Sequence, residues 1–190
     1  LTTRLVDDSS TAPNNGSTVD ADPNGNTSVF SSQTVSLGTS INAVNDAPVA
    51  TTGSASLTAV DEDSSDPSGD TVSSLFASNF SDATDAVTGG SSADSLAGVV
   101  ITANAATSSQ GVWQWQANGS NTWNSIATSG LDDDNALFLA SNTKLRFLPD
   151  SDFNGTPGSL TTRLVDDSST APSNGSTVDA DPNGNTSVFS

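Results

Sequence analysis

The chain has 190 residues and a formal net charge of −18, because 22 acidic residues face only 4 basic ones, and it contains no cysteine or histidine. This charge repels nucleic acid phosphates and anionic membrane surfaces and leaves cations as natural partners, while the lack of cysteine excludes disulfides and thiolate metal sites. No apolar run approaches the roughly 18 residues that a membrane-spanning helix needs, so we expect neither nucleic acid binding nor direct membrane insertion.

The first predicted element is LTTRLVDDSS, residues 1–10, which returns at residues 160–169. The match continues to the last residue with a single change, Asn14 against Ser173. Such near-identity at a fixed offset is typical of a tandem array in which each unit contributes length. We expect the chain to start inside one repeat and to stop inside the next.

The complete stretch 28–44 occurs once and predicts the last strand of a preceding repeat, which ends where Pro48 stops sheet pairing. We therefore divide the chain into the C-terminal part of that repeat (1–44), an inter-repeat junction (45–48) and a body (49–190) without its own last strand. An open edge beside a sequence-matched strand favours strand addition. Residues 32–44 are then expected to complete the sheet of another molecule, or the strand comes from the same chain in a continuous array.

Short apolar segments follow along the body, and several alternate with the period of two that predicts half-buried strands. They lie at residues 55–60, 96–105, 112–116, 123–126, 136–140, 144–148 and 160–165. Asn118-Gly119 predicts a hairpin, and residues 70–80 predict one short helix. Residues 168–187 and their copy at 9–28 are almost free of apolar residues and predict a long exposed loop. Aspartate outnumbers the single Glu62, which favours turns over helices, so the expected fold is all-β.

Three stretches carry a family resemblance: AVNDAPVA at 43–50, VDED at 60–63, and LRFLPDSDFNGTPGSLTTRLVDDSS at 145–169. They resemble the bacterial cadherin-like, immunoglobulin-like repeats of giant secreted adhesins and biofilm matrix proteins. The resemblance implies an immunoglobulin/cadherin-like β-sandwich repeat in an end-to-end array, with Ca²⁺ near the junctions and a place on the bacterial surface or in the extracellular matrix. This repeat exceeds the usual length of about 100 residues, and we assign the excess to 66–94 and 168–187.

Acidic residues at the junction and in two loops form the main candidate metal site. They are Asn45, Asp46, Asp61, Glu62, Asp63, Asp82 and Asp85. Calcium takes six to eight oxygen ligands, and so many carboxylates would repel one another without a cation. By resemblance, Asp46, Asp61 and Glu62 correspond to the family's junction ligands, and Asp82 and Asp85 to its second acidic loop. Solvated acidic turns are the competing explanation.

Two weaker candidate sets follow. Asp150, Asp152 and Asn154 imitate the start of an EF-hand loop, but Thr161 stands where that loop needs a bidentate glutamate, so a tight turn competes. The second set is Asp132, Asp134 and Asp166, for which solvated turns or a strand end serve equally well.

Three tryptophans leave a carbohydrate-binding module as the alternative function, because exposed indoles stack on sugars. Trp113 and Trp115 share one strand face, however, and a chain with 5% aromatic residues needs them in its core. An enzyme is not expected, since histidine and cysteine are absent and Lys144 is the single lysine. The sequence thus predicts a Ca²⁺-stiffened structural extender whose partners are neighbouring copies of the same repeat.

Overall fold

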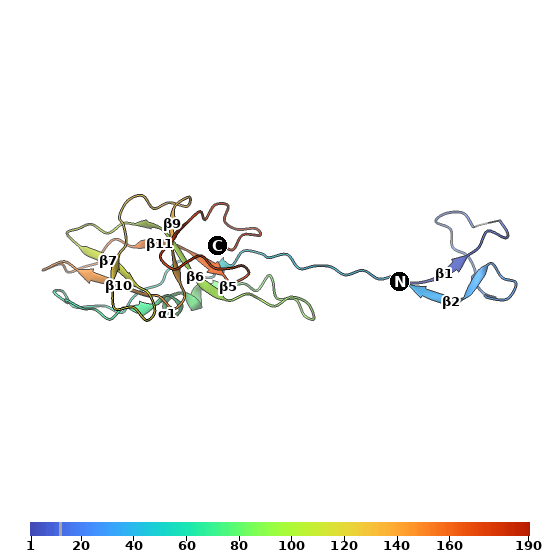
Figure 1. The fold of residues 1–190 in the computed structure, drawn as a ribbon, viewed down its shortest axis with the longest axis horizontal. Helices are drawn as coiled ribbons and strands as arrows, with labels where there is room; N and C mark the ends of the chain where they lie inside the picture. The colour runs from blue at the N-terminus through green and yellow to red at the C-terminus, as the bar shows by residue number, and fades with distance from the viewer. Residues whose placement is uncertain (12) are drawn as a thin grey trace. The chain divides into compact units, whose positions relative to one another are not determined.

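The computed structural model describes residues 1–11 and 13–190, which form two compact units, Leu1–Asn42 (unit 1) and Ala43–Ser190 (unit 2). The regular structure of both units is mainly antiparallel strands, with one short α-helix in unit 2 (Figure 1). The expectation of an all-β chain is confirmed at this level. No helix of the described residues is long and apolar enough to cross a membrane.

Unit 1 contains a single strand pair. β1 (Thr2–Val6) runs antiparallel to β2 (Phe30–Ser36), with Thr3 opposite Val35 and Val6 opposite Phe30. Five apolar side chains in and next to this pair are exposed: Leu1, Leu5, Val6, Val35 and Leu37. A two-stranded hairpin with no cover over its apolar side chains is marginally stable in water.

Unit 2 contains two four-stranded sheets and one two-stranded pair (Figure 1). The first sheet has the order β4 (Asp70–Thr71), β10 (Lys144–Pro149), β7 (Gly111–Gln116) and β8 (Asn124–Ser125). The second has the order β11 (Leu160–Asp166), β6 (Leu96–Asn104), β9 (Ala136–Ala140) and β12 (Thr177–Val178). The pair joins β3 (Val49–Ala50) to β5 (Phe80–Ser81).

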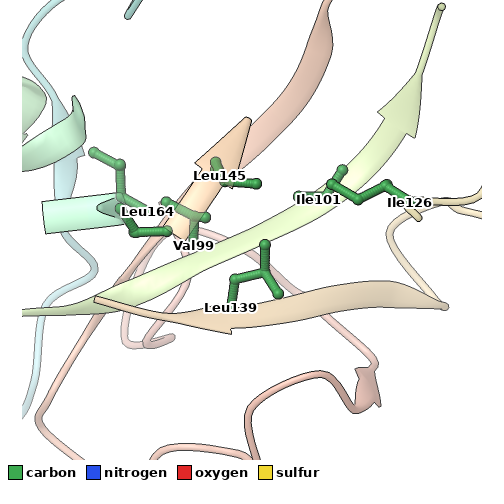
Figure 2. Packing of buried hydrophobic residues seen from close by; sticks show 7 residues of the cluster. Val99, Ile101, Ile126, Leu139, Leu145 and Leu164 are labelled. Carbon is green, nitrogen blue, oxygen red and sulfur yellow. The ribbon is translucent and has the colours of Figure 1, made fainter. Parts of the chain in front are cut away.

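The two four-stranded sheets share one hydrophobic core. Val99, Ile101, Leu139 and Leu164 enter it from the second sheet and Leu145 enters from the first (Figure 2). Val72 of the helix and Ile126 complete the buried set, and Trp113 and Trp115 pack against it. Residues of both sheets therefore face one another across apolar side chains.

The second sheet is apolar on its other face as well, because four consecutive residues of β6, 98–101, are buried. A second cluster there contains Val100, Phe138, Val165 and Ala180. Ala180 and the half-buried Val178 belong to residues 168–187, so the prediction that this segment is an exposed loop is wrong. The physical reason is that a fully apolar sheet face must be covered, and the few apolar residues of the loop suffice for it.

Of three further local predictions, the helix and the hairpin are confirmed and one strand is not. The helix α1 (Val72–Phe76) lies within the predicted segment, is capped by the Thr71 hydroxyl at the Ser74 amide, and continues into the 3₁₀ turn η1 (Ala77–Asn79). Asn118-Gly119 joins β7 to β8 with Gly119 at φ +77°. The strand predicted at 55–60 is wrong: these residues form no strand, and only Leu57 among them is half-buried. Apolar side chains that stay exposed contribute little to stability.

Candidate metal centre

Three carboxylates gather where short strands of unit 2 end. Asp82 follows β5, Asp85 lies three residues on, and Asp94 precedes β6; one oxygen of each lies within 4.8 Å of the others. The Asp94 amide donates to Asp82 Oδ2 at 2.6 Å. This bond links the start of β6 to the end of β5.

The junction residues lie against this group. The amide of Asp46 donates to both carboxylate oxygens of Asp85, at 3.2 and 3.1 Å. The Asn45 side chain donates to the Ser187 carbonyl at 3.3 Å, and Val49 pairs with Ser81. Hydrogen bonds on both sides of Pro48 therefore fix the junction beside Asp82 and Asp85.

The end of β11 contributes two further acids. Asp166 lies opposite Leu96 in the β11–β6 pairing, and Asp167 Oδ1 accepts a hydrogen bond from the Ser95 amide at 2.7 Å. One oxygen of Asp166 accepts from the Ser168 amide at 3.0 Å. The antiparallel register thus carries the acidic end of β11 to the residues that precede β6.

These acids are buried without a positively charged partner. Asp82, Asp85 and Asp166 are only 4%, 7% and 1% exposed. Among the described residues, Asp82 Oδ1, Asp166 Oδ2 and Asn45 Oδ1 are buried without a hydrogen-bond partner. Neither ion pair of the described chain reaches them, since those pairs hold Asp66 and Asp133. Burying such charge unpaired costs several kcal/mol per group, of order 2–7 even for a neutral polar group.

The electrostatics of the group follow from this burial. Desolvation raises the pKa of Asp82, and the nearby carboxylates of Asp85, Asp166 and Asp46 raise it further. Desolvation also raises the pKa of Asp94, and among the neighbouring carboxylates Asp166 raises it most. A hard divalent cation bound by these oxygens would reverse both effects, because it compensates the charges and supplies the unpaired oxygens with a partner.

The residues predicted as one ligand set are divided by the fold. Asn45, Asp46, Asp82 and Asp85 come together, but Asp61, Glu62 and Asp63 do not join them. Instead Asp63 accepts from the Asp152 amide at 3.0 Å, and Glu62 accepts from the Asn154 side chain at 3.2 Å. Because β4 is antiparallel to β10, residues before Asp70 lie beside those after β10. The seven residues of the predicted site therefore fall into two groups in the fold.

The weaker candidates separate in the same way. Asp166 joins the buried group, whereas Asp132, Asp134, Asp150, Asp152 and Asn154 are exposed. Asp133, which lies between Asp132 and Asp134, forms a bidentate ion pair with Arg163 at 2.8 and 3.0 Å. This ion pair lowers the pKa of the Asp133 carboxyl. Asp94 was not predicted at all. Asp94 lies directly before a predicted strand, and this strand pairs with the acidic end of β11. That position was the sequence feature from which its place at the site could have been predicted.

The three tryptophans are half-buried, and each contacts other side chains or the backbone of unit 2. The Trp113 ring N–H donates to the Gly158 carbonyl at 2.8 Å, and its ring meets Phe147 edge-on at 5.2 Å. Trp115 packs against the shared core. The Arg146 guanidinium lies 4.0 Å from the centre of the Trp123 ring. Each indole thus has a partner within unit 2.

A scan against models of protein families finds no match, and searches of curated proteins and solved structures find no significant similarity. The acidic group of residues 45–46, 82–94 and 166–167 is therefore interpreted from its own geometry, and we call it the acidic site below.

Proposed function

We propose that this chain is a structural extender repeat of a bacterial surface adhesin or extracellular fibre, stiffened by Ca²⁺. In this proposal unit 2 is an immunoglobulin/cadherin-like β-sandwich, and copies follow one another end to end outside the cell. The observation that carries the proposal is the burial of Asp82, Asp85 and Asp166 beside Asn45 and Asp46, with three side-chain oxygens unpartnered.

The calcium part rests on charge compensation. Ca²⁺ accepts six to eight oxygens at about 2.3–2.6 Å and prefers carboxylate, amide and carbonyl ligands, and the acidic site offers carboxylate oxygens and the Asn45 amide oxygen. Without a cation, the raised pKa values of Asp82 and Asp94 report charges that the fold holds at a cost. With a cation, Asn45 and Asp46 are tied to Asp82 and Asp85, so the chain leaves unit 2 in a fixed direction.

The extender part rests on the repeat. Near-identical copies suit a protein in which each unit contributes length and none has a separate task. Two sheets that share one core support the sandwich. The motifs at 43–50 and 145–169 resemble those of secreted adhesin repeats, and this resemblance supports the location outside the cell.

The carbohydrate-binding alternative has less support. A sugar platform needs an exposed indole face, but Trp113 donates to Gly158 and packs on Phe147, and Arg146 covers Trp123. Sugars are therefore expected to leave the tryptophan emission unchanged.

Calcium titration calorimetry on the full chain tests the proposal. The wild type is expected to bind Ca²⁺, and Asp82→Asn is expected to weaken binding at least tenfold. Asp179→Asn is the matched control, because this exposed aspartate lies outside the acidic site and an asparagine can keep its bond to the Asp181 amide. Absence of calcium binding by the wild type, or equal loss in both variants, would refute the calcium part.

A further inference from the structure

Two Asn-Gly-Ser stretches of unit 2 form the same local turn. They are residues 118–120, between β7 and β8, and residues 174–176, in the segment that covers the second sheet. In each turn the serine amide donates at 3.0 Å to the carbonyl of the residue before the asparagine, which is Ala117 or Ser173. The two glycines have φ angles of +77° and +82°. Because sequence and local geometry are matched, a difference in chemical behaviour comes from the surroundings.

The surrounding structure holds the second turn in place. Asn174 Oδ1 accepts hydrogen bonds from the Ala140 amide at 2.9 Å and from the hydroxyl of the buried Thr143 at 2.8 Å. The Gly175 amide donates to the Phe138 carbonyl at 2.9 Å. Three hydrogen bonds thus fix the asparagine side chain and the backbone nitrogen that follows it.

The first turn lacks these restraints. Asn118 and Gly119 are exposed, and a Cβ atom placed on Gly119 would meet no atom within 4 Å. Of the residues that the structure describes, none forms a hydrogen bond with the Asn118 side chain or the Gly119 amide; the nearest bonds join Ser120 to Ala117 and Thr122 to Ser120. Rotation of the Asn118 side chain therefore breaks no hydrogen bond.

An asparagine followed by glycine can lose its side-chain amide without an enzyme. The backbone nitrogen of the glycine attacks the side-chain carbonyl carbon of the asparagine, the new N–C bond closes a five-membered succinimide, and ammonia leaves with the proton of the attacking amide. Water then opens the ring at either carbonyl and gives aspartate or isoaspartate. Glycine favours the attack because it has no Cβ atom to obstruct the approach. The attack also requires a backbone nitrogen that is free of other bonds and a side chain that can rotate toward it.

We propose that Asn118 is a site of spontaneous deamidation in the folded protein, and that Asn174 in the identical tripeptide is protected by its hydrogen bonds. Each event replaces a neutral amide by a carboxylate and adds one negative charge to the −18 of the chain. Isoaspartate also lengthens the backbone of the turn between β7 and β8 by one atom. The reaction needs only water and does not depend on calcium.

Peptide mapping by mass spectrometry tests this on the full chain, incubated in mildly alkaline buffer with chelator. Asn118 is expected to lose its amide at least tenfold faster than Asn174. In guanidinium chloride the protecting hydrogen bonds are lost, so the two identical tripeptides are expected to react at similar rates. Equal rates at the two sites in the folded chain, or the same difference in rate with and without denaturant, would overturn the proposal.

The variant Asn118→Asp provides the second arm, because it carries the aspartate product from the start. No described residue bonds the Asn118 side chain, so this variant is expected to keep the melting temperature and the tryptophan emission of the wild type. A clearly lower melting temperature would show that the Asn118 amide stabilises the turn, and would contradict the free side chain from which the proposal is drawn. Neither arm involves calcium, so a failure of the acidic site leaves both outcomes unchanged.

Discussion

Leu5 and Leu164 occupy the same position in two identical ten-residue segments, yet Leu5 is 62% exposed and Leu164 is 4% exposed. Val6 and Val165 differ in the same way, at 48% and 1%. Val6 pairs with Phe30 as Val165 pairs with the equivalent Phe189, so the difference comes from the sheets around β11. The segment alone specifies a strand and its neighbour, and the rest of the repeat supplies the core.

This pair gives a matched mutational test. Leu164→Ala removes a buried side chain from the shared core and is expected to cost about 2–5 kcal/mol of unfolding free energy. Leu5→Ala makes the same chemical change at an exposed position and is expected to leave unit 2 unchanged within about 0.5 kcal/mol. Urea unfolding followed by tryptophan emission, which reports unit 2 alone, measures both. Equal effects would show that the two copies share one environment.

Chelation should lower the melting temperature of unit 2. A ligand that binds only the folded state at 100 times its Kd contributes about 2.7 kcal/mol, and each kcal/mol shifts the melting temperature of a domain of this size by roughly 2–4 °C. Removal of Ca²⁺ by EGTA is therefore expected to lower it by about 5–10 °C. Asp82→Asn should show a clearly smaller shift on chelation, and a wild type whose melting temperature does not change with chelator would contradict the prediction.

The calcium-free chain should become more stable on mild acidification. The pKa values of Asp82 and Asp94 are raised in the fold above the ordinary 3.8, so the folded state binds these protons more tightly than the unfolded chain. Their contribution is complete below pH 3.8 and is lost as the pH rises through the folded values. Asp133 acts in the opposite sense: its pKa is lowered, and its contribution is lost as the pH falls below 3.8.

Melting curves in EGTA between pH 7 and pH 4 measure this effect. The wild type is expected to gain stability toward pH 4. The double variant Asp82→Asn/Asp94→Asn separates this gain from the general relief of repulsion in a chain of charge −18 and should gain less. Identical pH profiles for the wild type and the double variant would mean that the fold raises the pKa of neither Asp82 nor Asp94.

Arg146 should matter more than its charge suggests. It is 6% exposed, donates to Gln114 at 2.9 Å and to the Pro67 carbonyl at 3.1 Å, and stacks on Trp123. Arg146→Lys keeps the charge but loses the planar fork, so it is expected to cost about 1–3 kcal/mol. Lys144→Ala, at an exposed neighbouring position, should stay within about 0.5 kcal/mol. The urea unfolding midpoints of the two variants measure this difference. Equal midpoints would show that Arg146 contributes no more to stability than the exposed Lys144.

Periodicity and turn chemistry were sufficient for much of the fold. Alternation predicted β7 and β10, and Asn118-Gly119 predicted the hairpin to β8, because these features depend on neighbouring residues. The cover over Val100 and Phe138 was not predicted, since it comes from a polar loop about 80 and 40 residues further along the chain. Burial of Ala180 and Val178 depends on the sheet beneath them and leaves no local pattern.

The acidic site shows the same limit. Asn45, Asp46, Asp82 and Asp85 were predicted together from their composition and resemblance, but the composition of residues 61–63 is just as acidic. The antiparallel pairing of β4 with β10 sends those residues to the 150–155 turn, whereas the register of β11 on β6 brings Asp166 to Asp94. Which carboxylates meet is a property of strand register, and register depends on the whole sheet.

The location of bound calcium tests the central claim most directly. A crystal of the full chain grown in CaCl₂ and measured near a wavelength at which calcium scatters anomalously will show where the ion lies. The account predicts an anomalous peak among Asp82, Asp85, Asp94 and Asp166, coordinated by oxygens that have no partner within the chain. An ordered acidic site without anomalous density, or calcium confined to the exposed acids of residues 61–63 and 150–154, would contradict it.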